Sequence, residues 1–195
     1  PPGRSGDEWS FSMRPLGRFT RQLELLETSL AQSPRPFHLA VVGGGASGCE
    51  LALAIQRRLS KLAGFRLTLL QANRRLLPSF PDRAAHLMQD RLHAAGIDVQ
   101  LEACVVGGNP GRLRLSSGQE LACDGVLWAT PATPPQLLRT SGLTVDDSGF
   151  LLVRESLQSL SHPEVFGTGD CVTFLPQPQL SRNGVHAVRQ GRVLF

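Results

Sequence analysis

The sequence predicts an α/β fold, in which a parallel sheet is covered by helices on both faces. Two observations carry this prediction. Short apolar runs of strand length alternate with segments whose apolar residues recur at helical spacing. A glycine-rich turn at residues 43–48 stands between the first apolar run, HLAVVG, and the helical segment that follows it.

The elements are justified in order along the chain. Residues 1–12 are rich in Pro, Gly and Ser and are expected to be irregular. Helical spacing of leucine and alanine predicts helices at 16–30, 46–62 and 82–95. Apolar runs predict strands at 38–43, 65–70, 97–101 and 125–129. Two short extended pieces, 112–115 and 120–122, flank a Ser-Ser-Gly turn and indicate a β-hairpin, or meander. Residues 184–195 have the pattern of a last helix.

Composition narrows the function classes. The 195 residues are 41% apolar, which is typical of a globular protein with a core. The net charge of +4 is a mild excess without a long basic run, so we expect no nucleic-acid partner. No apolar stretch approaches the ~20 residues of a membrane span. The four cysteines form no close pair, which argues against a disulfide framework or a metal site and favours a reducing, cytoplasmic location.

The glycine turn has a chemical explanation. Gly43, Gly45 and Gly48 follow the pattern G-x-G-x-x-G between a strand and a helix. The first glycine allows a tight turn, the second lets a pyrophosphate approach the backbone, and the third lets the helix pack close to the strand. The N–H groups of Ala46 and Ser47 at the helix start would then face the phosphates. The pattern predicts a dinucleotide site, and a purely structural turn is the less favoured alternative.

The second strand ends at the position where a dinucleotide site usually has an acidic residue for the adenosine ribose. Gln71 stands there instead, followed closely by Arg74 and Arg75. A glutamine can hydrogen-bond a ribose hydroxyl and does not repel a 2′-phosphate, with which either arginine could pair. NADPH is therefore allowed and NADH is not excluded. Both arginines could equally be ordinary surface residues.

The wider pattern is similar to a known group of flavoproteins. VVGGGASGCE at 41–50, with Glu50 two residues after the last glycine, resembles the NAD(P)H domain of flavoproteins with two dinucleotide-binding domains. This group includes the pyridine nucleotide-disulfide oxidoreductases and the type II NADH dehydrogenases. SLQSLSHPEVFGTGDCV at 156–172 resembles their second FAD motif, an apolar strand ending in Gly-Asp, and NGVHAVRQGRVLF resembles the helix that follows. Within the group, the sequence looks similar to oxidoreductase-like proteins that are sometimes fused to selenide, water dikinase.

The resemblance implies roles for individual residues. Gly43, Gly45 and Gly48 would bind the NAD(P)H pyrophosphate, and Glu50 would point toward the nicotinamide and the flavin. The remaining implied contacts are Ala129 and Thr130 in the nucleotide cleft, Gly169 and Asp170 at the FAD ribitol, the Cys171 N–H at the FAD phosphate, and Val185 and His186 at the flavin pyrimidine edge.

The resemblance also implies a division of the chain. Residues 1–35 would be a lead-in and helix from a linker or part of the FAD domain, 36–131 a Rossmann-like NAD(P)H-binding domain, and 132–195 the C-terminal segment of the FAD domain. The first FAD motif of the family has no counterpart here, Pro131 replaces a glycine of the family's ATG segment, and no redox cysteine pair exists. The chain begins with Pro and its last helix has no stop signal, as expected of a piece of a longer protein.

The function expected from these features is that of part of an FAD-dependent NAD(P)H oxidoreductase, in which hydride passes from NAD(P)H to the flavin and then to an unidentified small-molecule acceptor. No side chain needs to act as an acid or base in that step, because the cofactors carry the chemistry. Two alternatives remain open. One is a non-catalytic nucleotide-binding scaffold or regulatory domain with a fusion partner. The other is an NADH:quinone oxidoreductase peripheral to the inner membrane. A homodimer is also allowed.

Overall fold

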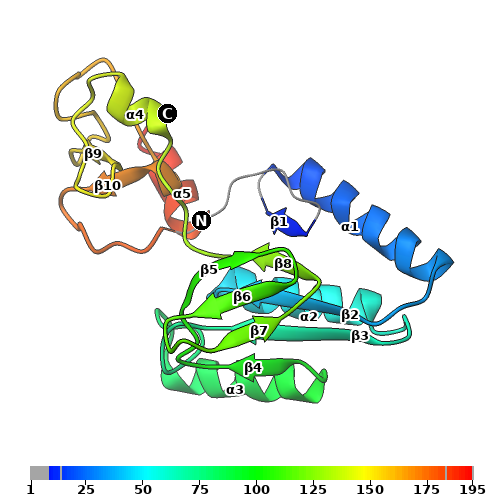
Figure 1. Cartoon of the computed structure of the whole chain (residues 1–195). Helices are drawn as coiled ribbons and strands as arrows, with labels where there is room; N and C mark the ends of the chain where they lie inside the picture. Colours follow the sequence, from blue (N-terminus) through cyan, green and yellow to red (C-terminus); the bar gives the residue numbers. More distant parts are fainter. Residues whose placement is uncertain (1–8, 14, 183, 195) are drawn as a thin grey trace. The chain divides into compact units, whose positions relative to one another are not determined.

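A computed structural model describes residues 9–13, 15–182 and 184–194. These residues divide into two compact units, one ending at Thr130 and the other beginning at Pro131 (Figure 1). Each unit has a hydrophobic core of its own. Within the described residues, no helix combines the length and the apolar character that crossing a bilayer requires.

The first unit is built on a parallel sheet. Its strands among the described residues are, in spatial order, β1 (Ser10–Ser12), β8 (Gly125–Trp128), β2 (Phe37–Val42), β3 (Phe65–Leu70) and β4 (Asp98–Gln100). Every neighbouring pair runs parallel. The chain leaves β2 toward β3 on one side, and β8 returns on the other side, so the strand order reverses at β2. Ligands of open α/β sheets bind in the crevice beyond the carboxyl ends of the strands at such a reversal.

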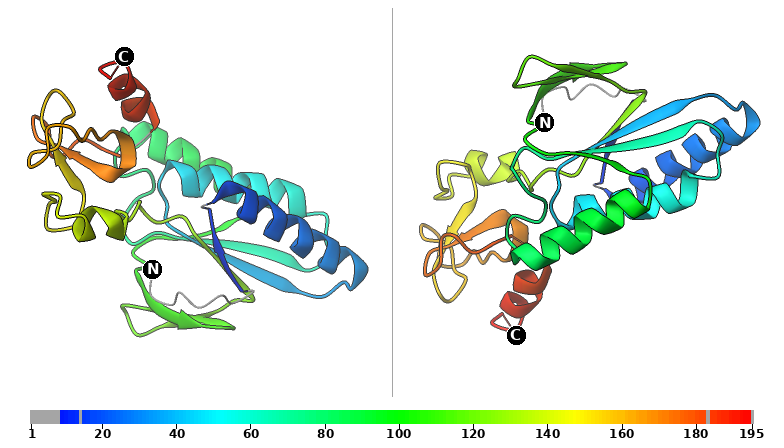
Figure 2. Two further views of the ribbon diagram at one scale, coloured as in Figure 1. Left: turned by 90° about the horizontal axis from the view of Figure 1, so that it is seen from above. Right: turned by 90° about the horizontal axis from the view of Figure 1, so that it is seen from below.

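Alternate residues of a strand face opposite sides of the sheet. In β2, Leu39 and Val41 contribute to one core and Ala40 and Val42 to the other. The helices of this unit that the structure describes all pack on the first of these cores, and Figure 2 shows them as one layer along that face. They are α1 (Leu16–Gln32), α2 (Ala46–Leu59) and α3 (Asp82–Ala94).

The opposite face carries a small antiparallel sheet instead of helices, so the expectation of helices on both faces is wrong for the described residues. This sheet has the order β5 (Val105–Asn109), β6 (Arg112–Leu115) and β7 (Glu120–Ala122). Leu113 and Leu115 alternate with arginines in β6 and are buried in the second core. A hairpin with one apolar face covers the parallel sheet as effectively as an amphipathic helix would.

The predicted hairpin is confirmed by the antiparallel pairing of β6 with β7, in which Arg114 lies opposite Glu120. Strand β5 was not expected, since its sequence VVGGN holds two glycines that weaken a strand pattern. The pairing of β5 with β6 shifts register between Val105 and Gly107, which marks a bulge. The other predicted helices and strands of this unit are present, with small differences at their ends.

The expectation of an irregular lead-in over residues 1–12 is wrong for Ser10–Ser12, which form β1; residues 1–8 lie outside the described residues. The strand is short and pairs in parallel with β8 at the edge of the sheet. The Trp128 indole N–H donates to Ser10 Oγ at 3.1 Å. Three residues with only one apolar side chain give no periodic signal, so this strand depends on its partner rather than on its own sequence.

The second unit contains shorter elements. They are α4 (Gln136–Thr140), β9 (Leu151–Val153), the 3₁₀ turn η1 (Gly169–Cys171), β10 (Val172–Phe174) and α5 (Gly184–Gly191). Strands β9 and β10 pair in parallel. Helix α5 ends earlier than predicted, and Phe195 lies outside the described residues.

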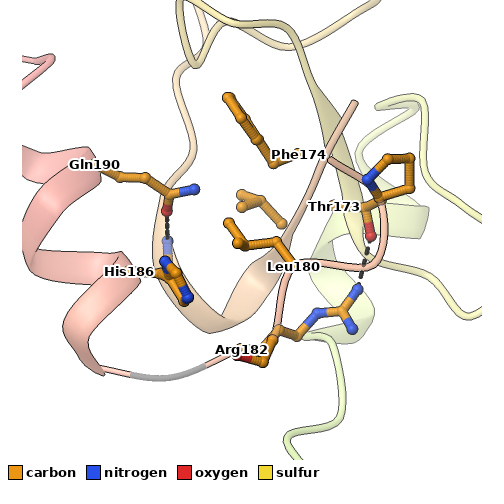
Figure 3. A pocket seen from close by; sticks show the side chains of 10 residues that line it. Thr173, Phe174, Leu180, Arg182, His186 and Gln190 are labelled. Carbon is orange, nitrogen blue, oxygen red and sulfur yellow. Dashed lines mark hydrogen bonds between the residues drawn. The ribbon is translucent and has the colours of Figure 1, made fainter. Parts of the chain in front are cut away.

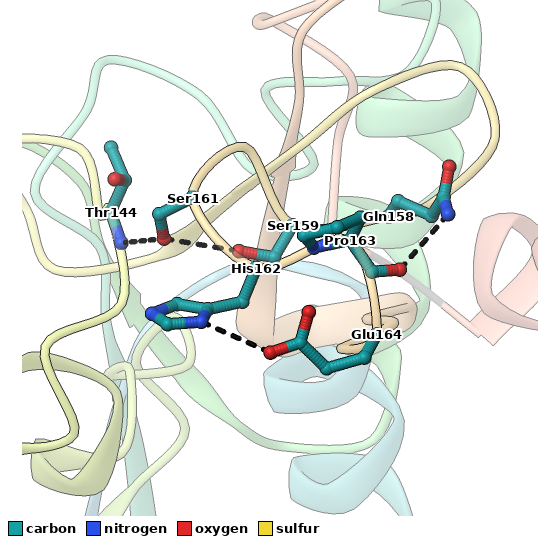
Figure 4. A network of polar contacts seen from close by, with 7 residues as sticks. All are labelled: Thr144, Gln158, Ser159, Ser161, His162, Pro163 and Glu164. Atoms are coloured by element: carbon teal, nitrogen blue, oxygen red, sulfur yellow. Dashed lines mark hydrogen bonds and ion pairs between the residues drawn. The ribbon is translucent and has the colours of Figure 1, made fainter.

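The segment leading into Gly169 was expected to be a strand, and this expectation is wrong. Residues 154–168 form a loop with isolated bridges, such as that between Gln158 and Phe166. Side chains hold the loop through local polar contacts (Figure 4). The Gln158 amide donates to Pro163 O at 2.9 Å, and His162 Nδ1 lies 3.1 Å from Glu164 Oε1. Hydrogen bonds of this kind compete with strand pairing.

Candidate functional site

The glycine turn joins β2 to α2 at the point where the strand order reverses. Gly43 has a φ of +119°, a conformation that favours glycine, and a Cβ there would lie 2.5 Å from Ala129 O. A Cβ on Gly48 would lie 1.8 Å from Gly43 O. These two positions therefore require glycine for the turn itself and for the close approach of α2. Ala129, directly after β8, donates its N–H to Val42 O at 2.9 Å and so lies beside the turn.

Gly45 differs from the glycines on either side of it. It precedes the first residue of α2 in extended conformation, and, its two chain neighbours apart, no atom of the described residues lies within 4 Å of the position that its Cβ would take. Among the residues that the structure describes, no side chain caps this helix start. The first N–H groups of a helix have no carbonyl one turn before them, so those of Ala46 and Ser47 have no partner within α2. Ser47 and Glu50 are exposed on the same helix.

Gln71 has a role that sequence analysis did not predict. Its side chain is buried, with 6% of the residue exposed. Its Oε1 accepts a hydrogen bond from the Gly44 N–H at 3.1 Å, and its Nε2 donates to Arg75 O at 3.1 Å. The amide therefore ties the glycine turn to the loop that follows β3. The predicted contact with a ribose stays a prediction.

Leu76 and Leu77 complete this support and were also missed. Leu77 N–H donates to Gly44 O at 2.8 Å, and Leu77 adopts a φ of +49°, which is uncommon for a residue with a side chain. Leu76 is fully buried, and its Cδ2 would lie 2.6 Å from a Cβ on Gly44. The available signal was a pair of leucines inside an otherwise polar loop. Both polar backbone groups of Gly44 are thus used within the chain, which leaves the N–H groups after it for a ligand.

The two arginines of this loop are in different situations. Arg75 donates to Asp82 Oδ1 and to Pro78 O, both at 2.7 Å. The Arg74 side chain is 91% exposed and contacts Glu102 Oε1 at 3.1 Å. An exposed pair of this kind contributes little to stability, so Arg74 can exchange its partner. The Arg75 side chain, in contrast, is held by two contacts near its own loop.

The thiol nearest the turn is not a reactive group. Cys49 is buried in α2 and its Sγ lies 3.6 Å from Gly44 O. Burial, together with the neighbouring Glu50, raises the pKa of the Cys49 thiol to about 11. The thiolate is the nucleophilic form, so Cys49 is inert at neutral pH and fills space beneath the turn.

In the second unit, the predicted residues gather at η1 and at the first turn of α5. Gly169 has a φ of +71°, and its N–H donates to Gln190 Oε1 at 2.8 Å. Cys171 Sγ lies 3.2 Å from Thr168 O. Val185 is exposed, whereas His186 is half-buried and lines a pocket (Figure 3). Other residues of that pocket are Thr173, Phe174, Leu180, Arg182 and Gln190.

Gln190 makes a contact that the sequence did not predict, because its side chain accepts a hydrogen bond from the Gly169 N–H of η1. No element of the sequence pattern connects residues 169 and 190. The structure therefore brings Gly43, Gly48, Gln71 and Ala129 together in the first unit, and Gly169 and Gln190 together in the second.

Comparisons with known proteins find a matching family model, similar sequences and similar solved structures. Residues 17–191 match the family model described as pyridine nucleotide-disulphide oxidoreductase. A type II NADH:quinone oxidoreductase of Haemophilus influenzae is 28% identical over 149 residues, which cover 71% of this chain and 34% of that protein. A nitric oxide reductase FlRd-NAD(+) reductase of Vibrio vulnificus is 31% identical over 155 residues, 75% of this chain and 38% of that protein.

Among solved structures, an NAD-dependent persulfide reductase from A. fulgidus aligns with 99% of this chain and 36% of its own, with a TM-score of 0.77 and 22% identity. This likeness shows the fold. The chain spans about a third of the length of the curated relatives described above. Since the family model covers residues 17–191, the chain belongs to the pyridine nucleotide-disulphide oxidoreductase family.

Proposed function

We propose that the glycine turn at 43–48 binds the pyrophosphate of NAD(P)H. One observation carries this proposal. Gly43, Gly44 and Gly48 each face atoms of the chain, whereas Gly45 faces open space at the start of α2. A phosphate placed there would accept hydrogen bonds from the N–H groups of Ala46 and Ser47 and would be favoured by the helix dipole. The site also lies beyond the carboxyl end of β2, where such ligands bind.

The adenosine end of the nucleotide would lie along the loop after β3, with Gln71 near the ribose. Arg74 is the exposed cation of this loop and would pair with a 2′-phosphate. Glu50, Ala129 and Thr130 would line the other end of the site. Arg75 supports the loop rather than the cofactor, because its guanidinium is held by Asp82 and Pro78. We propose that both NADPH and NADH are accepted.

The second unit would contribute to an FAD site through Asp170 and Cys171 in η1 and Val185 and His186 in α5. The fit rests on two features: η1 turns sharply at Gly169, and Ala187 in the first turn of α5 lies beside that glycine. A helix N-terminus favours negative charge on a flavin ring. These residues would hold FAD, which would supply the capacity to accept a hydride from NAD(P)H and to deliver electrons to an acceptor. The chain would orient both cofactors and exclude water.

On this proposal the protein is part of an FAD-dependent NAD(P)H oxidoreductase of the cytoplasm, and residues 36–131 and 132–195 belong to its two cofactor domains. The acceptor is a small molecule or a small electron-carrier protein. The relatives whose names are given above act on a quinone or on the partner FlRd, so both classes of acceptor occur among similar proteins.

A nucleotide titration tests the proposal. The chain is titrated with NADH and, separately, with NADPH, and the fluorescence of the nucleotide is followed. We expect saturable binding that is lost in Gly45→Val, because the branched side chain fills the open space. Gly17→Val is the matched control, since Gly17 in α1 also has no atom within 4 Å of its Cβ position. If neither nucleotide binds, or if both variants bind equally well, the proposal fails.

A further inference from the structure

Helix α5 holds η1 from two sides. Gln190 Oε1 accepts a hydrogen bond from the Gly169 N–H at 2.8 Å, as Figure 3 shows. Ala187, one turn earlier on the same helix, has its Cβ 3.2 Å from the position that a Cβ on Gly169 would take. Gly169 is therefore fixed both at its N–H and at its α-carbon, in a conformation with a φ of +71°. We call this arrangement of Gly169, Ala187 and Gln190 the α5 clasp.

A second set of contacts fixes the segment that enters α5. The Arg182 guanidinium donates to Thr173 Oγ1 at 2.7 Å, and its central carbon lies 3.5 Å from the centroid of the Phe150 ring. Thr173 in turn donates to Asp146 Oδ2 at 2.6 Å. The entry of α5 is thereby attached to β10, which directly follows η1. Contacts at the end of α5 and in the segment before it both reach residues 169–174. The helix and η1 are therefore held together.

The hydrogen bond to Gln190 has a consequence for the residue next to it. Asp170 directly follows Gly169, so its backbone position depends on the turn that Gly169 makes at a φ of +71°. Losing the hydrogen bond to Gln190 would release this turn and let the backbone at Asp170 move. The side chain of Gln190 therefore ties the backbone that carries Asp170 to helix α5.

We propose that Gln190 is a positioning residue of the flavin site, which acts through Gly169 and touches no cofactor atom. This inference rests on the proposed function, because it assumes that Asp170 and α5 face FAD. This role requires an acceptor oxygen at the end of a side chain as long as that of glutamine. A glutamate retains that oxygen, and an asparagine places it one methylene short.

Three variants of the chain test the inference: Gln190→Asn, Gln190→Glu and, as a matched control, Arg189→Ala, since Arg189 is exposed on the neighbouring position of α5. The first measurement is hydrogen exchange of the Gly169 amide by NMR, which needs no cofactor. Losing one hydrogen bond should raise its exchange rate about tenfold in Gln190→Asn. The rate should stay within about twofold of the wild-type value in Gln190→Glu and in the control. Gln190→Met replaces the asparagine variant if that variant does not fold.

The second measurement is a titration of each variant with FAD, followed by the quenching of flavin fluorescence. The expected result is that the Kd rises about tenfold in Gln190→Asn, in step with exchange, while Arg189→Ala is unchanged. Equal protection of Gly169 in the wild type and in Gln190→Asn would overturn the inference. Lost protection with unchanged FAD affinity would also overturn it, leaving Gln190 a structural residue. If the exchange pattern is as expected but no variant and no wild-type chain binds FAD, the proposed flavin site fails and the clasp stands as a feature of folding alone.

Discussion

Gln71 Oε1 accepts a hydrogen bond from the Gly44 N–H at 3.1 Å, and this contact links the loop after β3 to the turn after β2. The other end of the same amide donates to Arg75 O. One side chain thus supplies an acceptor to one loop and a donor to the other. A carboxylate could satisfy only the first of these contacts.

Gln71→Glu should therefore destabilise the chain, although an acidic residue is usual at this position of dinucleotide sites. The charge would be buried, and the Arg75 carbonyl would lose its donor and face a carboxylate. We expect a loss of about 1–3 kcal/mol in the free energy of unfolding, measured by urea denaturation. The loss should shrink in acid, where the protonated Glu can donate to Arg75 O. Gln177→Glu, on an exposed loop, is the control and should change little. Equal stability of the two variants at neutral pH would contradict the assigned role.

Gly48→Ala should destabilise the first unit, because the added methyl would lie 1.8 Å from Gly43 O and α2 would have to move away from the turn. A cost of about 1–3 kcal/mol is expected for overpacking of this kind. Gly17→Ala is the matched control within α1, where the site is open. That variant should gain about 0.5–1 kcal/mol, since alanine favours a helix over glycine. Urea unfolding of both variants decides the question, and a neutral Gly48→Ala would show that α2 packs less closely than described.

Arg74→Ala should weaken the binding of NADPH about tenfold or more and leave NADH nearly unchanged, because one charge-assisted contact to the 2′-phosphate is lost. Its stability should change by less than about 1 kcal/mol, since its pair with Glu102 is exposed. Arg75→Ala should do the reverse, lowering the unfolding midpoint with the same proportional effect on both nucleotides. Parallel fluorescence titrations and melting curves check this. If Arg75→Ala weakens NADPH binding selectively and Arg74→Ala lowers the unfolding midpoint, the assignment is wrong.

His38 predicts a pH dependence of stability. Its Nδ1 lies 2.8 Å from Ala122 O and its Nε2 lies 2.9 Å from Thr68 Oγ1. Since a carbonyl only accepts, Nδ1 carries the proton in the neutral ring. Burial lowers the pKa of His38 from its ordinary value of 6.5, and Arg66 contributes, against the opposite effects of Ala122, Asp124 and Asp98.

A base with a lowered folded pKa binds protons more readily when unfolded, so its contribution to stability is present above pH 6.5 and is lost as the pH falls through the folded value. We expect urea unfolding to show lower stability near about pH 5 than near about pH 7.5. His38→Gln, which keeps a donor and an acceptor but does not titrate, should flatten this difference. A slope unchanged by the substitution would place the titrating group elsewhere.

Much of the first unit could be predicted because its signals are local. The valine and leucine runs of β2 and β3 and the glycines at 43, 45 and 48 lie within a short stretch, and their order specifies a strand, a turn and a helix. Strands β1 and β5 could not be predicted, since one is Ser-Phe-Ser and the other contains Gly107 and Gly108.

The candidate site could likewise be predicted only in part. The turn was found from its motif, whereas the contact of Gln71 with Gly44 and that of Gln190 with Gly169 join residues that no periodicity relates. Side chains that act on the backbone of a distant turn leave no spacing rule in the sequence. Loop 154–168 was misassigned for a related reason, because the side chains of Ser161 and Gln158 bond backbone groups that a strand would otherwise pair.

The position of β1 has a consequence for how the first unit forms. Ser10 pairs with Val126, so residues from the two ends of this unit lie side by side in one sheet. Closing so long a loop costs entropy before the pairing is gained, and contacts of this range slow folding. During synthesis, β1 has no partner until β8 has left the ribosome. The earlier β2–α2–β3 segment, with its glycine turn, can assemble before β8 and β1 are added beside β2.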